Sequence, residues 1–256
     1  MSRNVQSKLW REIRFVLGRV QKKSRNIRKH GYLRQAANEN IWHHIFRESF
    51  RTGGWKSELR LNMGRWAAGP AFLYVLHRIL EEVQPQHVVE LGLGESSKLI
   101  SKFAEHDSFP TSHVIVEHSQ EWIDAFQSRF KLSGATSLLR LPLKGKVKNK
   151  TPQQAVAYDQ IPKDVWAEAD LVLVDGPFGS RRYSRNDVMD YVQLQDPSTS
   201  FIILLDDTHR TGEIDTLDLI QNDLSRRDIP YAKGHYGGLK RCTVIASANF
   251  PWLASL

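Results

Sequence analysis

Short apolar runs alternate with longer amphipathic stretches along the chain from residue 87 onward. The apolar runs predict strands at 87–93, 112–118, 136–141, 169–176 and 200–207, and the amphipathic stretches predict helices at 96–105, 119–130, 184–195 and 211–226. Strands and helices that alternate at this spacing predict an α/β fold, with a mainly parallel sheet and helices on both of its faces.

The two ends of the chain have other patterns. Residues 229–236 and 239–247 predict two closing strands that are joined through Gly237–Gly238. Before the alternating region, residues 32–50 and 67–83 have the apolar spacing of helices, and Pro85 ends the second one. We therefore expect a basic N-terminal helical arm over residues 1–60 and a Rossmann-like domain over residues 61–256.

The first part of the arm is both amphipathic and strongly basic. Apolar residues recur every three or four positions from Val5 to Val20, which predicts a helix with one apolar face. Residues 1–34 contain eleven Lys or Arg and one Glu, a net charge of +10 within a chain of +8. The basic balance therefore describes the arm, and the rest of the chain sums to −2.

Four partners fit such a helix. It can pack on its own domain or on a second subunit in a homo-oligomer, or residues 1–30 can lie on an anionic membrane surface. Nucleic acid is the weakest partner, because the arm carries no nucleic-acid-reading motif. A mitochondrial presequence is a further interpretation of this segment, because such presequences are also rich in arginine and poor in acids.

Composition limits the class of protein further. The hydrophobic fraction of 41% and the charged fraction of 25% are ordinary for a soluble globular protein. The sequence shows no apolar run long enough to span a bilayer and no secretory signal near its start. The single cysteine, Cys242, cannot form an internal disulfide. We expect a cytoplasmic protein, with peripheral attachment at the inner membrane face as an option through the arm.

Acidic residues end four of the five predicted parallel strands. Glu90 lies in the first strand and is followed by Gly92 and Gly94, and the other strand ends carry Glu117 with His118, Asp175, and the pair Asp206–Asp207. The carboxyl ends of parallel strands share one edge of the sheet, and ligands bind there at the point where the strand order reverses. This shared acidic edge beside a glycine turn is a candidate binding site.

The glycine turn does not match a dinucleotide site. Its third small position is Ser97, where the dinucleotide fingerprint has a glycine that allows close helix packing. Glu90 would repel a pyrophosphate but could accept hydrogen bonds from a cationic or amino-bearing ligand. Glu117 lies 23 residues past Gly94, where it is placed to bind two ribose hydroxyls.

The Glu-x-Gly-x-Gly turn, together with an acid that closes the second strand, resembles the class I S-adenosylmethionine-dependent methyltransferases over roughly residues 67–250. The resemblance implies a Rossmann-like sheet with a closing antiparallel hairpin. It also implies that S-adenosylmethionine is the cofactor, with Glu90 facing its methionine end and Glu117 binding its ribose. The implied cofactor site comprises Glu90, Gly92, Gly94, Ser96, Ser97, Glu117, His118, Asp175 and Gly176. The alternative is a nucleotide-binding scaffold that docks a partner or nucleic acid through its basic arm.

The loop after the fourth strand bears on the acceptor of the methyl group. Residues 175–177, Asp-Gly-Pro, resemble the loop of O-methyltransferases that act on sugars and other hydroxyl compounds. The stretch 204–210 resembles the strand-five ending of glucuronoxylan-type polysaccharide methyltransferases. These resemblances imply a hydroxyl acceptor on a glycan or another small molecule. Arg181, Arg182 and Arg185 follow in the loop and are candidates for binding an anionic acceptor.

A sugar hydroxyl is a poor acid, so its methylation needs a base or a metal ion. Asp175, Asp206 and Asp207 offer an oxygen-ligand set for Mg²⁺ or another divalent cation. The alternative catalytic groups are His209 or His235 as general base, with Asp175 or Asp207 beside them. The two aspartates of the fifth strand could instead cap the following helix.

Overall fold

The computed structural model describes residues 31–51, 54–57, 59–63, 67–106 and 111–256. The predicted helix at the start of the arm therefore lies outside the described residues, and so does its predicted membrane or partner contact. Within the described residues, no helix combines the length and the apolar character that a membrane crossing requires.

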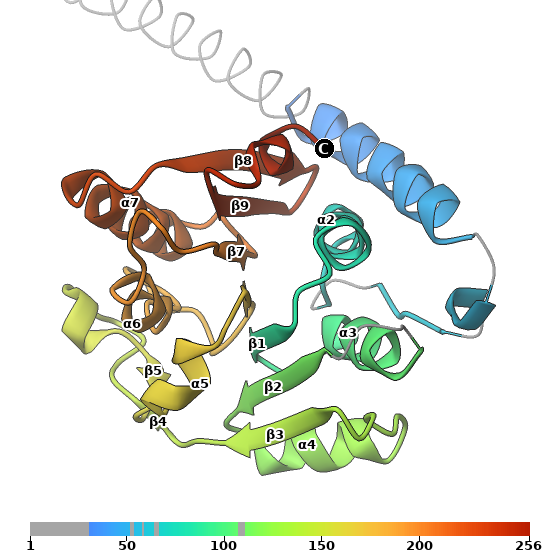
Figure 1. Ribbon diagram of the computed structural model, residues 1–256, viewed down its shortest axis with the longest axis horizontal. Coiled ribbons are helices and arrows are strands. Elements are labelled where there is room, and N and C mark those ends of the chain that lie inside the picture. The colour runs from blue at the N-terminus through green and yellow to red at the C-terminus, as the bar shows by residue number, and fades with distance from the viewer. Residues whose placement is uncertain (1–30, 52–53, 58, 64–66, 107–110) are drawn as a thin grey trace, which may run out of the picture.

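A seven-stranded sheet forms the centre of the molecule, in the order β3-β2-β1-β6-β7-β9-β8 (Figure 1). The strands are β1 (His87–Leu91), β2 (Ser112–Glu117), β3 (Thr136–Arg140), β6 (Leu171–Val174), β7 (Ile202–Leu205), β8 (Tyr231–Gly237) and β9 (Arg241–Ser247). The pairs from β3 to β7 are parallel, and β9 runs antiparallel to both β7 and β8. The predicted Rossmann-like, mainly parallel sheet with its closing antiparallel hairpin is confirmed.

Helices cover both faces of this sheet (Figure 1). Residues of α2 (Pro70–Glu82), α3 (Glu95–His106) and α4 (Gln120–Gln127) pack on one face, and residues of α5 (Lys163–Ala167), α6 (Val188–Val192) and α7 (Thr211–Arg226) pack on the other. The central strands β1, β6, β7 and β9 are almost fully buried, because both of their faces meet helices, whereas the edge strands β3 and β8 are partly exposed. The apolar runs of the central strands therefore show no alternation, and this made them visible in the sequence.

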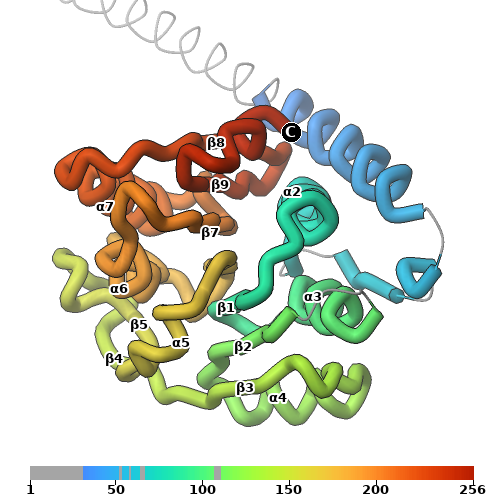
Figure 2. Tube along the Cα trace, viewed as in Figure 1, coloured from blue at the N-terminus to red at the C-terminus, as the bar shows by residue number. Residues whose placement is uncertain are grey.

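The helix over residues 31–50 is part of the folded body. Its Phe46 is buried in the core, and the Trp42 ring lies 5.6 Å from Tyr74 of α2 and 5.9 Å from Tyr236 of β8, between ring centroids. Figure 2 shows this helix passing beside α2 and the C-terminal segment. The C-terminal half of the predicted arm therefore packs on the domain, while the boundary at residue 60 stays a prediction.

Three features of the described residues differ from the sequence-based expectation, the first being the short helix α5 (Lys163–Ala167), which was not expected. The helix predicted at 184–195 is shorter, α6 covering only Val188–Val192, because residues 181–187 form turns in which Tyr183 and Arg185 have φ angles of 52° and 60°. A two-stranded antiparallel ribbon of β4 (Leu143–Lys144) and β5 (Ala157–Tyr158) was not expected. Three short 3₁₀ helices complete the described elements: η1 (Gly54–Ser57), η2 (Pro152–Gln154) and η3 (Pro251–Ala254).

The order of the strands reverses between β1 and β6. From β1 the chain moves outward to β2 and β3, and after β6 it moves the other way to β7. Ligands of open α/β sheets bind beyond the carboxyl ends of the strands at such a point. The turn after β1 and the loop after β6 therefore frame the candidate site.

Candidate active site

The two loops at this point meet through glycines. Gly92 has a φ of 100°, and a Cβ atom there would lie 2.9 Å from the backbone nitrogen of Gly176. The Gly176 N–H also donates to the carbonyl of Leu91. Gly94, by contrast, has open space where a Cβ would stand. The first glycine is thus required for loop packing, and the second leaves backbone accessible to a ligand at the start of α3.

Glu117 holds this turn from the end of β2. Its Oε2 accepts a hydrogen bond from the Leu93 N–H at 3.1 Å, and its Oε1 accepts from the N–H groups of His118 and Ser119 at 2.7 and 2.9 Å. Each carboxylate oxygen can accept two hydrogen bonds, so Oε2 retains acceptor capacity for a hydroxyl. This position beside the Gly92–Gly94 turn fits the predicted ribose-binding role.

Glu90 lies beneath the turn and is fully buried. Its carboxylate accepts a hydrogen bond from the Ser96 hydroxyl and lies 3.0 Å from Nε2 of His113 on β2. In the strand register Glu90 is level with Ile115 and Leu173, on the face covered by α3. The side chain therefore holds the first turn of α3 onto β1 and β2, and its predicted place at the methionine end of the cofactor stays a prediction.

The other predicted cofactor residues also have internal contacts. Ser97 accepts a hydrogen bond from the Gly94 N–H at 2.9 Å and so closes the turn. The His118 ring packs edge-on against Phe178, with 5.1 Å between ring centroids. Phe178 is 69% exposed, so an aromatic wall stands over the site at the loop after β6. Ser96 and Ser97 shape the turn, and His118 Nδ1 lies 2.8 Å from Glu117 Oε1, which leaves Phe178 as the most exposed ring at the site.

The three predicted aspartates do come together. Asp175 follows β6, Asp206 and Asp207 follow β7, and one carboxylate oxygen of each lies within 4.8 Å of the others. Asp206 and Asp207 are almost fully buried, and one oxygen of each has no hydrogen-bond partner among the described residues. The sequence therefore located this acidic group correctly, from the strand ends alone.

The charges around the aspartates were not foreseen. Arg185, predicted to bind the acceptor, is only 4% exposed and lies among the acids. Its Nη2 is 3.2 Å from Asp175 Oδ1 and 3.0 Å from Asp207 Oδ2. Burial is the physical reason for the difference: a buried carboxylate group needs a counter-charge, and this arginine supplies it.

Two further cations reach the same aspartates. Arg210 Nη1 lies 2.8 Å from Asp207 Oδ2, and Lys240 Nζ lies 3.9 Å from oxygens of both Asp206 and Asp207. Arg210 is the arginine that closes the stretch 204–210 noted in the sequence, whereas Lys240 was not singled out. Each comes from a connection at the carboxyl edge of the sheet: Arg210 from the β7–α7 loop, and Lys240 from the β8–β9 turn.

Burial and mutual repulsion keep part of this group protonated. Burial, followed by the charge of Asp206, raises the pKa of Asp175 to about 8, and burial followed by the charge of Asp207 raises the pKa of Asp206 to about 6. A quarter of the Asp175 side chain is exposed, which limits the part that burial plays there. Near neutral pH the pair therefore titrates together, as closely spaced carboxylates do.

A cavity of about 810 Å³ is lined by Arg210 and Lys240, the two cations that reach the aspartates, although none of the three aspartates lines it. It lies between the helix over 31–50, the start of α2 and the connections that carry Arg210 and Lys240. Its walls include His43, His209, Arg210, Lys240 and Glu39, with Tyr32, Met63 and Leu239 among the apolar contributors. Along the sheet, the aspartates after β6 and β7 lie between the glycine turn after β1 and this cavity.

The two predicted histidines differ in position. His209 lines the cavity, and its Nδ1 accepts the Arg241 backbone N–H at 3.4 Å. Burial lowers the pKa of His209 and so favours the neutral ring. Because Nδ1 accepts a hydrogen bond, we assign the proton of the neutral ring to Nε2. His235 lies on the edge strand β8, where its Nδ1 is 2.8 Å from Thr243 Oγ1, and it does not line the cavity.

The remaining predicted arginines lie on the surface of the loop. Arg182 pairs with Asp215 of α7, with 2.8 Å between Nη2 and Oδ1, and Arg181 is exposed. Neither lines the cavity. Arg181 and Arg182 were expected to bind an anionic acceptor because they follow Asp175 in the loop. The cations that line the cavity are instead Arg210 and Lys240.

Tyr158 is a site residue that the sequence did not reveal. It comes from β5, its hydroxyl has no hydrogen-bond partner among the described residues, and a Cβ on Gly176 would lie 2.7 Å from it. Burial, followed by the charge of Glu117, raises the pKa of Tyr158 well above its usual value. The hydroxyl therefore stays protonated beneath the loop after β6.

No protein-family model and no curated protein matches the sequence. Solved structures with similar folds include the O-methyltransferase TomG of Streptomyces achromogenes in complex with SAM (15% identity, 82% of this chain and 89% of that chain, TM-score 0.45). They also include the SAH-bound methyltransferase PaMTH1 of Podospora anserina (14%, 80% and 87%, 0.43) and the METTL16 methyltransferase domain (14%, 83% and 80%, 0.46). Likeness at this level does not transfer a ligand or an acceptor to this chain.

Proposed function

We propose that this chain is an S-adenosylmethionine-dependent methyltransferase that methylates a hydroxyl oxygen. The observation that carries the proposal is the meeting of the Gly92 turn, the Gly176 loop and Glu117 at the point where the strand order reverses. The open space at Gly94 gives a ligand access to the backbone, and the exposed Phe178 offers a surface for a flat ring.

The charge balance favours a cation over a pyrophosphate. Four acids lie together beyond the turn, Asp175, Asp206, Asp207 and Glu213, and three cations face them, Arg185, Arg210 and Lys240. With every group ionised one negative charge is left over, and with Asp175 protonated the group is neutral, so a bound cation favours the ionised form of Asp175. A sulfonium carries one positive charge, whereas a pyrophosphate would add to the negative charge.

The cofactor supplies an electrophilic methyl group, and the residues of this chain must align an oxygen with it and accept a proton. Asp175 is the base that the geometry favours, because it lies between the turn and the cavity. Its pKa of about 8 makes it a stronger base, and only its ionised form, which a nearby sulfonium favours, can accept the proton. His209 presents an N–H at Nε2, so we assign it as a hydrogen-bond donor that orients the acceptor.

We assign the acceptor to the cavity beside the aspartates. Its polar lining has more hydrogen-bond donors than acceptors. The lining residues include Arg210, Lys240, His43 and His209 but only one carboxylate, that of Glu39. This wall favours an acceptor that carries a carboxylate or phosphate, such as a uronic-acid glycan. Transfer of tritiated methyl groups to oligosaccharides with and without uronic acid tests the assignment, and equal labelling of the two sets would contradict it.

Calorimetry with S-adenosylhomocysteine tests the cofactor. We expect saturable binding by the wild-type chain and a loss of about 10- to 100-fold in Glu117→Ala, since a hydrogen bond to a carboxylate contributes about 1.5–3 kcal/mol. Glu121→Ala, which removes an exposed acid of the adjacent helix α4, is the control and should bind normally. Absence of binding by the wild type, with binding of another nucleotide, would support the scaffold alternative.

We also propose that the chain attaches to anionic membrane surfaces at the cytoplasmic face through residues 1–30. The support is the +10 charge of residues 1–34, and the helix that follows carries exposed Leu33, Ile41 and Ile45. The full-length chain should sediment with phosphatidylserine vesicles and not with phosphatidylcholine vesicles. Equal behaviour with both lipids would refute the attachment and leave packing on a second subunit as the role of the arm.

A further inference from the structure

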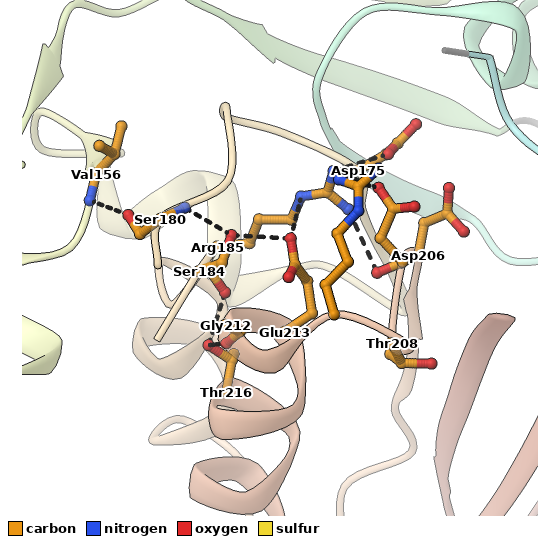
Figure 3. Close-up of polar contacts among 12 residues, drawn as sticks. Val156, Asp175, Ser180, Ser184, Arg185, Asp206, Thr208, Gly212, Glu213 and Thr216 are labelled. Carbon is orange, nitrogen blue, oxygen red and sulfur yellow. Dashed lines mark hydrogen bonds and ion pairs between the residues drawn. The ribbon is translucent and has the colours of Figure 1, made fainter. Parts of the chain in front are cut away.

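Arg185 occupies the place in the acidic group where a bridging metal ion would stand. Figure 3 shows its side chain extending from the loop before α6 toward Asp175 and the end of β7. One nitrogen, Nη2, contacts Asp175 Oδ1 at 3.2 Å and Asp207 Oδ2 at 3.0 Å, and Nη1 donates to the Asp206 carbonyl at 3.3 Å. A single guanidinium therefore connects all three aspartates.

The loop that carries Arg185 is built to hold it there. Glu213 at the start of α7 lies 3.9 Å from Arg185 Nε and accepts the Ser184 hydroxyl at 3.0 Å. The Thr216 hydroxyl donates to the Ser184 carbonyl at 2.6 Å (Figure 3). Arg185 and its partner Asp207 both have φ angles near 60°, a region that non-glycine residues adopt only when their surroundings impose it.

A divalent cation does not fit beside this arginine. Mg²⁺ requires oxygen ligands at about 2.0–2.1 Å in near-octahedral geometry. Two of the oxygens that would provide them, Asp175 Oδ1 and Asp207 Oδ2, already face Arg185 Nη2. Arginine stays charged in proteins, so it cannot make room by losing a proton. With Arg210 and Lys240 also present, the four acids and three cations leave at most one negative charge, which is too little to balance a divalent ion.

We infer that Arg185 is the resident cation of this site, that it replaces the divalent metal expected from the sequence, and that the chain works without one. Arg185 is a positioning residue: it fixes Asp175 and Asp207 relative to each other and leaves Asp175 partly exposed toward the ligand side. The positive charge of Arg185 offsets the repulsion between the three aspartates and so explains how their oxygens can lie within 4.8 Å of one another.

Titration with Mn²⁺, followed by electron paramagnetic resonance of the free ion, tests the inference without cofactor or acceptor. Its failure is thus distinguishable from a failure to bind S-adenosylhomocysteine. The full-length wild type should show no stoichiometric site up to about 1 mM Mn²⁺, the weak limit of functional oxygen-ligand sites. One Mn²⁺ bound per chain below that limit, and lost in Asp206→Asn, would overturn the inference.

Removing the arginine gives the converse test. Arg185→Ala should acquire one Mn²⁺ site that disappears in Arg185→Ala/Asp206→Asn. Arg210→Ala is the matched control: it removes a cation from Asp207 without vacating the bridging position, and it should acquire no site. A folded Arg185→Ala that gains no Mn²⁺ would also contradict the inference. If this variant does not fold, Arg185→Gln replaces it, and the wild-type titration decides independently.

Discussion

Alanine at the two glycines of the turn separates packing from ligand binding. In Gly92→Ala, the added Cβ would lie 2.9 Å from the Gly176 nitrogen, at a residue whose φ is 100°. A non-glycine residue in such a conformation costs about 1–3 kcal/mol, before any backbone shift. In Gly94→Ala, the added Cβ meets nothing within 4 Å, so the unliganded chain loses no contact.

The expected magnitudes differ accordingly. Gly92→Ala should lower the free energy of unfolding by about 2–3 kcal/mol, a decrease in Tm of about 4–12 °C for a domain of this size. Gly94→Ala should leave stability unchanged or raise it by up to about 1 kcal/mol, because alanine restricts the unfolded chain. Its S-adenosylhomocysteine affinity should nevertheless fall at least about tenfold, equivalent to about 1.4 kcal/mol, because the Cβ occupies space intended for the ligand.

Thermal unfolding and calorimetry on the same preparations measure both effects. Normal cofactor affinity in Gly94→Ala would refute the claim that this turn holds the ligand. Wild-type stability in Gly92→Ala would refute the close approach of the two loops. The two refutations are independent, so the experiment distinguishes an error in the fold of the loops from an error in the location of the site.

Three other substitutions test separate parts of the site. At pH values between the ordinary Asp175 pKa of 3.8 and about 8, the native state binds more protons than the unfolded state, so wild-type stability should fall as pH rises through this window. Asp175→Asn should flatten that decline by on the order of 2 kcal/mol. An unchanged slope in thermal scans at pH 5 and pH 8 would contradict the raised pKa. Tyr158→Phe removes a buried hydroxyl that has no hydrogen-bond partner among the described residues, so Tm should stay equal or rise while S-adenosylhomocysteine binds more weakly in calorimetry. A clear loss of Tm would mean that the hydroxyl is bonded in the free chain. Glu90→Gln should lower the free energy of unfolding in urea by about 1–3 kcal/mol, and it should reduce cofactor affinity less than Gly94→Ala does. A larger loss of cofactor affinity in Glu90→Gln than in Gly94→Ala would indicate that Glu90 contacts the ligand directly.

The fold followed from the sequence because each central strand is buried on both faces. Such strands are continuous apolar runs that end abruptly in a polar residue, as β6 does at Asp175 and β7 at Asp206. Their order and direction then follow from the alternation with helices. The β4–β5 ribbon had no such signal, because two-residue strands are too short for a pattern and its first strand leads into an alternating series of lysines.

The site was less predictable because its charges come from distant parts of the chain. An acid at a strand end is placed by the sheet itself, and Asp175, Asp206 and Asp207 were therefore found. A cation in a connection can point to solvent or inward, and the sequence around Arg185 and Lys240 does not distinguish the two. The cavity depends on helix 31–50 packing against the β8–β9 turn, where the Glu39 carboxylate accepts the Leu239 N–H, a contact between residues 200 positions apart.

The Glu-x-Gly-x-Gly motif locates the turn at the candidate site, but it does not by itself tell what the Glu90 carboxylate contacts. An acid two residues before the first glycine marks the turn, but its carboxylate is committed to Ser96 and His113 in the interior. A fully buried carboxylate without partners would cost several kcal/mol, so the hydroxyl and the imidazole are part of what permits an acid there. By linking β1, β2 and α3, this group orients the backbone at Gly94, which is the part of the turn that a ligand can reach. The acid therefore acts on the ligand site through the position of the helix, and its substitution should be read first as a change in that position.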